Sequence, residues 1–230
     1  MHPVICTIGP LTIYSYGLTL VLAFVVGSFL ASRQAKKINI DPEVIFNLAF
    51  VVFVFGVIGA RLFYVIENLK VYLRFPIEII MLQHGGLSWF GGFILGTTAA
   101  VFYLRRKKVK VFVGLDLVAP FLALAQAIGR IGCLLNGCCY GKDSIPTQAY
   151  SGVILLLIYI TLRFMQDRPH KEGQIFFSYV FLYSIKRFFI EFWRADNPPI
   201  FMNLTLFQIL CIVAFFISLA NLIRIIRSKR

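Results

Sequence analysis

Charged residues are scarce in this sequence, at 14% of 230 residues, whereas soluble domains usually carry roughly 25%. Acidic residues are the scarcest, because ten Asp and Glu stand against 23 Lys and Arg. Hydrophobic residues reach 59%, well above the ~45–50% of a soluble domain. This composition excludes a soluble globule, and it equally excludes an intrinsically disordered chain.

Low-complexity tracts, internal repeats and long polar linkers are also missing, so nothing in the sequence separates domains. We therefore expect residues 1–230 to form a single integral membrane domain. The first apolar segment has no basic n-region before it and no small-residue cleavage site after it, which favours a retained helix over a signal peptide.

Long apolar runs dominate what is present, and they have about the ~17–25 residues that a helix needs to cross a bilayer. The sequence thus predicts an all-α polytopic membrane protein with about seven transmembrane helices. They are expected at Leu11–Ala31, Val44–Ile66, Gly86–Leu104, Phe112–Leu135, Ala149–Phe164, Gln174–Phe192 and Leu204–Ile223.

The cations between these runs predict the topology. Fifteen of the 23 Lys and Arg follow the first, third, fifth and seventh runs, and four lie in the intervening loops. Because positive loops stay cytoplasmic, the C-terminus is expected in the cytoplasm and the N-terminus outside. A net charge of +13 is also found in nucleic-acid-binding proteins. Cations in short clusters between apolar runs instead favour the lipid bilayer as partner, and no nucleic acid.

The remaining cations lie within or at the edges of apolar runs: Arg61, Arg130, Lys186 and Arg187. Each needs a partner or a wet cavity, because a charge inside a span costs at least ~2.5–3.5 kcal/mol. Arg130 and Arg187 are the stronger candidates, since two guanidinium groups in one cavity would bind a lipid phosphate bidentately. Structural roles stay open for the others: Arg61 would pair with Glu67 or Asp116, and Lys186 would extend to the interface.

In the sixth run, Tyr183, Arg187 and Glu191 are spaced four residues apart, which places them on one helix face. Such a polar stripe must face protein or water and is a candidate site. The alternative is an Arg187–Glu191 ion pair that satisfies only itself.

Two glycine-rich segments offer a backbone that a ligand can approach closely. The first is HGGLSWFGGFILG, from His84 to Gly96, and the second is GRIGCLLNGCCYGK, from Gly129 to Lys142. Close packing of helices through small residues is the alternative for both.

Five cysteines raise the question of a metal or a disulfide. Cys6 and Cys211 are isolated, whereas Cys133, Cys138 and Cys139 form a C-x4-C-C pattern on the predicted outer side. That spacing matches no standard zinc pattern and lacks a nearby His, so we expect no metal. A disulfide and plain structural thiols both stay open, and the thiols are favoured.

The sequence resembles the phosphatidylglycerol–prolipoprotein diacylglyceryl transferases along nearly its whole length. The motifs that carry the resemblance are YGL (Tyr16 to Leu18), GARLFYV (Gly59 to Val65), GGLSWFGG (Gly85 to Gly92), GRIGCLLNGCCYG (Gly129 to Gly141), PTQAY (Pro146 to Tyr150), YSIKRFFIEFWR (Tyr183 to Arg194) and FQIL (Phe207 to Leu210).

This resemblance implies a seven-helix enzyme of the bacterial inner membrane that needs no cofactor. It would move the diacylglyceryl group of phosphatidylglycerol onto the lipobox cysteine of a prolipoprotein signal peptide and release glycerol 1-phosphate. By motif, the positions for substrate binding or catalysis are Tyr16, Arg130, Asn136, Gly141, Tyr183 and Arg187. The residues considered above add His84 for catalysis and, for substrate binding, Arg61, Gly85, Gly86 and Glu191.

The sequence departs from the family pattern within the signature regions. Phe90 stands where the family commonly has His, and Cys133 and Cys138 stand where Asn and Glu are usual. The segment Lys142 to Ile145 is short, where the family often carries a larger external insertion. These departures leave the proton acceptor open, with His84 the nearest imidazole. They also leave open another acceptor substrate, or a lipid-binding or lipid-translocating protein without catalysis.

Overall fold

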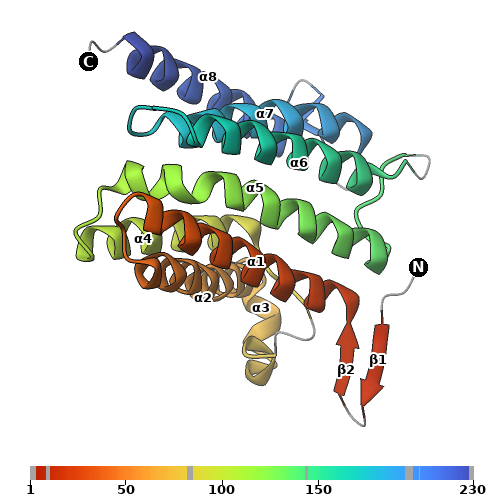
Figure 1. The fold of residues 1–230 in the computed structure, drawn as a ribbon. Helices are drawn as coiled ribbons and strands as arrows, with labels where there is room; N and C mark the ends of the chain where they lie inside the picture. The colour runs from red at the N-terminus through yellow and green to blue at the C-terminus, as the bar shows by residue number, and fades with distance from the viewer. Residues whose placement is uncertain are drawn as a thin grey trace. The chain divides into compact units, whose positions relative to one another are not determined.

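The computed structural model describes residues 4–8, 11–81, 85–142, 145–194, 199–201 and 203–227, which are mostly helical (Figure 1). The described part contains seven long helices: α1 (Ser15–Lys37), α2 (Pro42–Glu67), α4 (Trp89–Arg106), α5 (Val111–Asn136), α6 (Thr147–Gln166), α7 (Gln174–Trp193) and α8 (Leu206–Arg227). Two short helices, α3 (Leu69–Tyr72) and the 3-10 helix η1 (Pro76–Ile79), follow α2. The predicted all-α class is confirmed.

Each predicted apolar run coincides with one long helix, but two of the predicted starts are wrong. Residues Leu11–Tyr14 form strand β2, which pairs antiparallel with β1 (Val4–Ile8). Likewise, Leu204–Thr205 form β4, which pairs with β3 (Pro199–Phe201). Apolar β-branched residues suit a paired strand as well as a helix, so hydropathy alone does not place these boundaries.

Within the described ranges, five helices are long and apolar enough to cross a membrane, namely α1, α2, α5, α6 and α8. In the other two long helices the charges fall inside every 18-residue stretch. Each such stretch of α7 includes Lys186, Arg187 and Glu191, and the 18 residues of α4 include Arg105 and Arg106. The count of seven spans therefore stays a prediction, as does the orientation of the termini.

The chain divides into two compact units, residues 35–114 and residues 1–34 with 115–230. In the unit of residues 35–114, α2 and α4 pack closely through glycines. A Cβ at Gly59 would collide with the backbone of Gly91, and the reverse also holds. Gly92 and Gly96, also in α4, lie against α2 as well. The alternative reading of small residues as a packing surface is thus correct for these glycines of HGGLSWFGGFILG.

In the other unit, Asp116 anchors the start of α7. Its carboxylate accepts hydrogen bonds from the backbone N–H groups of Gly173 at 2.6 Å and Phe176 at 2.7 Å. Gln166 of α6 donates to the Asp116 carbonyl at 3.0 Å. The apolar core beside these contacts consists of Ala119, Ala123, Ile158, Leu162, Ile175 and Tyr179. Asp116 thus fixes α7 against α5 and α6.

Candidate functional site

Four cations gather in the unit of residues 1–34 and 115–230. Lys186 interacts electrostatically with Arg130, Arg187 and Arg194, and Arg187 also interacts with Arg130 and Arg194. Arg130 comes from α5 and lies beside Gly152 of α6, and the other three come from α7 and its C-terminal end. We call these four residues the cation cluster. The structure thus places Arg130 and Arg187 within electrostatic range of each other, and a shared binding cavity stays a prediction.

Arg187 is held by an ion pair and an aromatic ring. Its Nη2 lies 2.9 Å from Oε2 of Glu191, one helical turn later, and its guanidinium lies over the ring of Phe207 at 4.9 Å. The other carboxylate oxygen of Glu191 accepts a hydrogen bond from Thr205 at 3.1 Å. The ion pair considered as the alternative is therefore formed. It also orients the guanidinium fork, because Glu191 is itself held from a second element.

Lys186 belongs to the cation cluster, and the sequence reasoning did not include it among the candidate site residues. Its side chain is buried, its Nζ donates to Oγ of Ser151 at 2.9 Å, and it lies over the ring of Tyr183 at 4.7 Å. The suggestion that Lys186 extends to a membrane interface is wrong. Its place beside Arg187 within an apolar run was the signal that could have identified it.

Both predicted tyrosines lie near these cations. Tyr183 packs against Tyr179, with ring centroids 5.7 Å apart, and interacts electrostatically with Arg187. Tyr16, on the exposed face of α1, interacts with Arg130 and with the thiols of Cys133, Cys138 and Cys139. Phenol hydroxyls there can donate hydrogen bonds to head-group oxygens.

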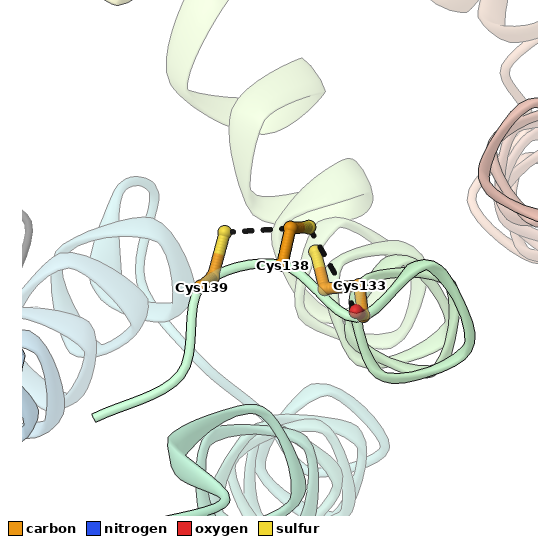
Figure 2. A group of neighbouring side chains, drawn as sticks. All are labelled: Cys133, Cys138 and Cys139. Carbon is orange, nitrogen blue, oxygen red and sulfur yellow. Dashed lines mark hydrogen bonds between the residues drawn. The ribbon is translucent and has the colours of Figure 1, made fainter. Parts of the chain in front are cut away.

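The three clustered cysteines lie at the end of α5 and in the loop after it (Figure 2). Their Sγ atoms all lie within 4.8 Å of one another, and each is a free thiol in the structure. Cys138 and Cys139 follow the end of α5 and therefore lie outside the apolar helices. A hydrogen bond from Cys133 lowers the pKa of Cys139, whereas burial raises the pKa of Cys138. Asn136 hydrogen-bonds to Cys138, so this predicted binding residue belongs to the same group.

Gly141 connects this loop to the end of α7. It forms an isolated antiparallel bridge with Arg194, and its N–H donates to the carbonyl of Ile145 at 2.9 Å. A Cβ at Gly141 would lie 2.7 Å from both the carbonyl oxygen of Trp193 and Cγ2 of Thr147. Only glycine therefore fits here without a shift of its neighbours.

Arg61 has a different environment, in the unit of residues 35–114. Its five guanidinium N–H groups donate to backbone carbonyls, which we call the carbonyl cage: Glu78, Ile79, Met81, Gly85 and Gly86. Three of these distances are 3.0 Å to Ile79, 2.9 Å to Gly86 and 3.2 Å to Met81. Glu67 instead accepts from Ser88 at 3.2 Å. The suggested Arg61–Glu67 pair is therefore wrong.

Gly85 and Gly86 reach Arg61 through a left-handed backbone, with φ of 80° and 81°. A Cβ at Gly86 would also collide with Tyr64 and Arg61. These two glycines thus lie together with Arg61, whereas Tyr16, Arg130, Asn136, Gly141, Tyr183, Arg187 and Glu191 belong to the other unit. His84 lies outside the described residues.

Comparison with known proteins gives a consistent picture. The family model described as prolipoprotein diacylglyceryl transferase matches residues 3–224. A phosphatidylglycerol–prolipoprotein diacylglyceryl transferase of Clostridium tetani is 33% identical, over 85% of this chain and 86% of its own. The enzymes of the same name from Enterococcus faecalis and Streptococcus mutans are 32% and 31% identical, over 88% and 86% of this chain and 83% and 85% of theirs. The chain therefore belongs to the prolipoprotein diacylglyceryl transferase family.

Proposed function

We propose that this protein transfers the diacylglyceryl group of phosphatidylglycerol to the lipobox cysteine thiol of a prolipoprotein, forming a thioether and releasing glycerol 1-phosphate. This reaction is the first step of bacterial lipoprotein maturation. Family membership and the names of the relatives support the activity. The cation cluster is the structural observation that carries it, because its chemistry suits the head group of an anionic phospholipid.

The charge of the cation cluster calls for an anionic ligand. Lys186 and Arg187 are buried to 4% and 9% exposure, and the carboxylate ion-paired with Arg187 is that of Glu191. Like charges that gather in an apolar body repel one another and lose hydration. A phosphodiester would relieve both effects, since guanidinium groups bind two phosphate oxygens at once and an ammonium adds a compact charge.

The reaction itself explains why cations would accelerate it. The acceptor sulfur, as a thiolate, attacks the glyceryl carbon that bears the phosphate ester. The carbon–sulfur bond forms as the carbon–oxygen bond breaks, and the electron pair leaves with the phosphate oxygen. The phosphate then gains negative charge, so Arg130 and Arg187 would stabilise the transition state more than the bound lipid.

The other predicted residues take supporting places in this proposal. Tyr183 would donate to a phosphate oxygen, and Tyr16, Asn136 and Gly141 would line the route by which the acceptor thiol approaches. Glu191 would orient Arg187. His84 remains the candidate proton acceptor for an acceptor thiol that is not bound to a metal.

Arg61 would act on substrate binding through the segment that it holds. Because all its donors are used by the carbonyl cage, we assign it the positioning of Gly85 and Gly86, where a lipid can approach the backbone closely.

We further propose that all seven long helices cross the bacterial inner membrane as a single integral domain, with the N-terminus outside and the C-terminus in the cytoplasm. The alternation of positive loops supports this orientation. Helix α7 would cross despite its charges, because Lys186, Arg187 and Glu191 are buried within the protein.

The test is a transfer assay with full-length protein in phosphatidylglycerol vesicles. Lipid labelled in its diacylglyceryl part is mixed with a lipobox peptide that contains Cys or, as control, Ser. We expect the label to appear on the Cys peptide alone, with glycerol 1-phosphate released in equal amount. Labelling of both peptides would reject a thiol acceptor, and lipid binding without transfer would identify a non-catalytic lipid-binding protein.

A further inference from the structure

The three thiols of Cys133, Cys138 and Cys139 form a group that the proposed transfer reaction does not use. Cys133 lies in the last turn of α5, and the other two follow in the loop. All three Sγ atoms lie within 4.8 Å of one another (Figure 2). The linear C-x4-C-C pattern groups the three cysteines but predicts no metal, because it does not show that the helix ends between the first cysteine and the second.

The backbone is specifically bent to bring these thiols together. Gly137 has φ of 73°, and Cys139 has φ of 65°, a left-handed conformation that a side-chain-bearing residue rarely adopts. The carbonyls on either side of the bend are held from α6: Gln148 donates to Cys138 at 2.6 Å and Thr147 donates to Cys139 at 2.8 Å. A strained residue that several contacts hold in place is typical of a functional site.

The spacing of the sulfur atoms suits a tetrahedral metal. Zinc–thiolate bonds of about 2.3 Å place the sulfur atoms of a tetrahedral site about 3.8 Å apart. Sγ of Cys138 and Sγ of Cys139 are 3.6 Å apart, and no pair of the three exceeds 4.8 Å. Small side-chain rotations would close the set on one ion. Three protein ligands with one open position are the arrangement of catalytic rather than structural zinc.

We propose that Cys133, Cys138 and Cys139 bind one Zn²⁺ ion, whose fourth position binds the acceptor thiol of the transfer reaction. This inference rests on the proposed function for the identity of the acceptor, but not for the metal site. On binding, the acceptor thiol releases its proton to water and ligates zinc as a thiolate, because a coordinated thiol is deprotonated. Its sulfur then forms the carbon–sulfur bond with the glyceryl carbon as glycerol 1-phosphate leaves with the electron pair.

The charges around the thiols match such a centre. Three thiolates and one Zn²⁺ carry a net charge of −1, and the acceptor thiolate makes it −2. Arg130 and Arg194 both interact electrostatically with Cys139, and both belong to the cation cluster. An anionic zinc–thiolate centre is therefore balanced by the side chains proposed to bind the phosphate, so nucleophile and leaving group would meet at one place.

Metal content of the full-length protein, purified without chelator, tests the site directly. We expect one Zn²⁺ per chain in the wild type and in Cys6→Ser, and loss of zinc in Cys138→Ser and Cys139→Ser. Disulfide formation among the three cysteines without metal, or bound Cu⁺ instead of Zn²⁺, would overturn the proposal. So would a zinc content that is the same in all four proteins.

The fourth position is tested by replacing zinc with Co²⁺, whose thiolate absorption reports each sulfur ligand. The Cys lipobox peptide should strengthen this absorption, and the Ser peptide should leave it unchanged. If neither peptide changes the absorption, the ion has only a structural role, and the proposal that it binds the acceptor thiol is refuted. If the wild-type protein without zinc still transfers the label, the proposed zinc site has no role in the reaction, and the proposed function stands. Zinc binding without any transfer would instead defeat the proposed function.

Discussion

Arg61 and Arg187 are both buried arginines on long helices, with 6% and 9% exposure, yet their surroundings differ completely. Arg61 gives all five N–H groups to the carbonyl cage. Arg187 meets one carboxylate and one aromatic ring, and it stands among three other cations. Burial therefore does not separate the two arginines, but their partners among the described residues do: backbone carbonyls for Arg61, and a carboxylate and an aromatic ring for Arg187.

The comparison also has an energetic side. The carbonyls around Arg61 would lose their partner if Arg61 were changed, so its main contribution is to folding. Among the described residues, the positive charge around Arg187 exceeds what Glu191 neutralises, and the anion that we propose as ligand would balance it. Variants at the two positions should consequently separate stability from activity.

Arg187→Lys should have the largest effect on activity. Lysine keeps the charge and can still pair with Glu191, but it loses the planar fork that binds two phosphate oxygens. We expect kcat/KM for transfer to fall by about 10²–10³-fold, the usual loss when a preorganised donor to a developing anion is removed. The vesicle transfer assay measures this, and membrane insertion is the control. Activity near the wild-type value would show that Arg187 does not bind the phosphate.

The sequence predicts the surroundings of Arg187 better than those of Arg61, and the reason is physical. Tyr183, Arg187 and Glu191 were placed on one face because helical geometry fixes their spacing, and the structure joins Arg187 to Glu191. The carbonyl cage was not foreseeable, because its acceptors lie 17 to 25 residues from Arg61 and are backbone atoms, which every residue type has.

The fold shows the same division. Seven apolar runs predicted seven helices, because lipid-facing helices need long apolar stretches. The strands β2 and β4 were missed, since their pairing partners, and not their hydropathy, decide their conformation. The sequence groups Cys133, Cys138 and Cys139, but it does not show how closely their sulfur atoms approach, because that depends on the left-handed turn at Cys139.

Arg61→Lys should produce the largest loss of stability. An ammonium has three donors and no planar fork, so several carbonyls of the cage would lack a partner. Unsatisfied buried groups cost about 1–3 kcal/mol each, and we expect the free energy of unfolding to fall by about 3 kcal/mol. Denaturant titration in lipid–detergent micelles measures the change. If stability stays unchanged while kcat/KM collapses, Arg61 binds substrate directly and the contrast with Arg187 disappears.

Gly141→Ala should have an intermediate effect. Its Cβ would lie 2.7 Å from the Trp193 carbonyl and from Thr147, so the bridge to Arg194 must shift. Overpacking of this kind costs about 2 kcal/mol. Gly129→Ala is the matched control, because a Cβ there has nothing within 4 Å and alanine favours a helix by about 1 kcal/mol. The same titration compares the two variants, and equal stabilities would show that the loop is not held as described.

Asp116→Asn should have the smallest effect, and it asks whether Arg187 depends on the way α7 begins. The carboxylate accepts two backbone N–H groups, from Gly173 and Phe176, whereas an amide offers one oxygen and turns its NH₂ toward the other donor. Losing one such bond should lower the free energy of unfolding by about 1 kcal/mol. Because Arg187 is also held by Glu191 and Phe207, kcat/KM should fall far less than in Arg187→Lys. A loss of activity as large as that of Arg187→Lys would mean that the anchor at the start of α7, and not the local ion pair, positions the guanidinium.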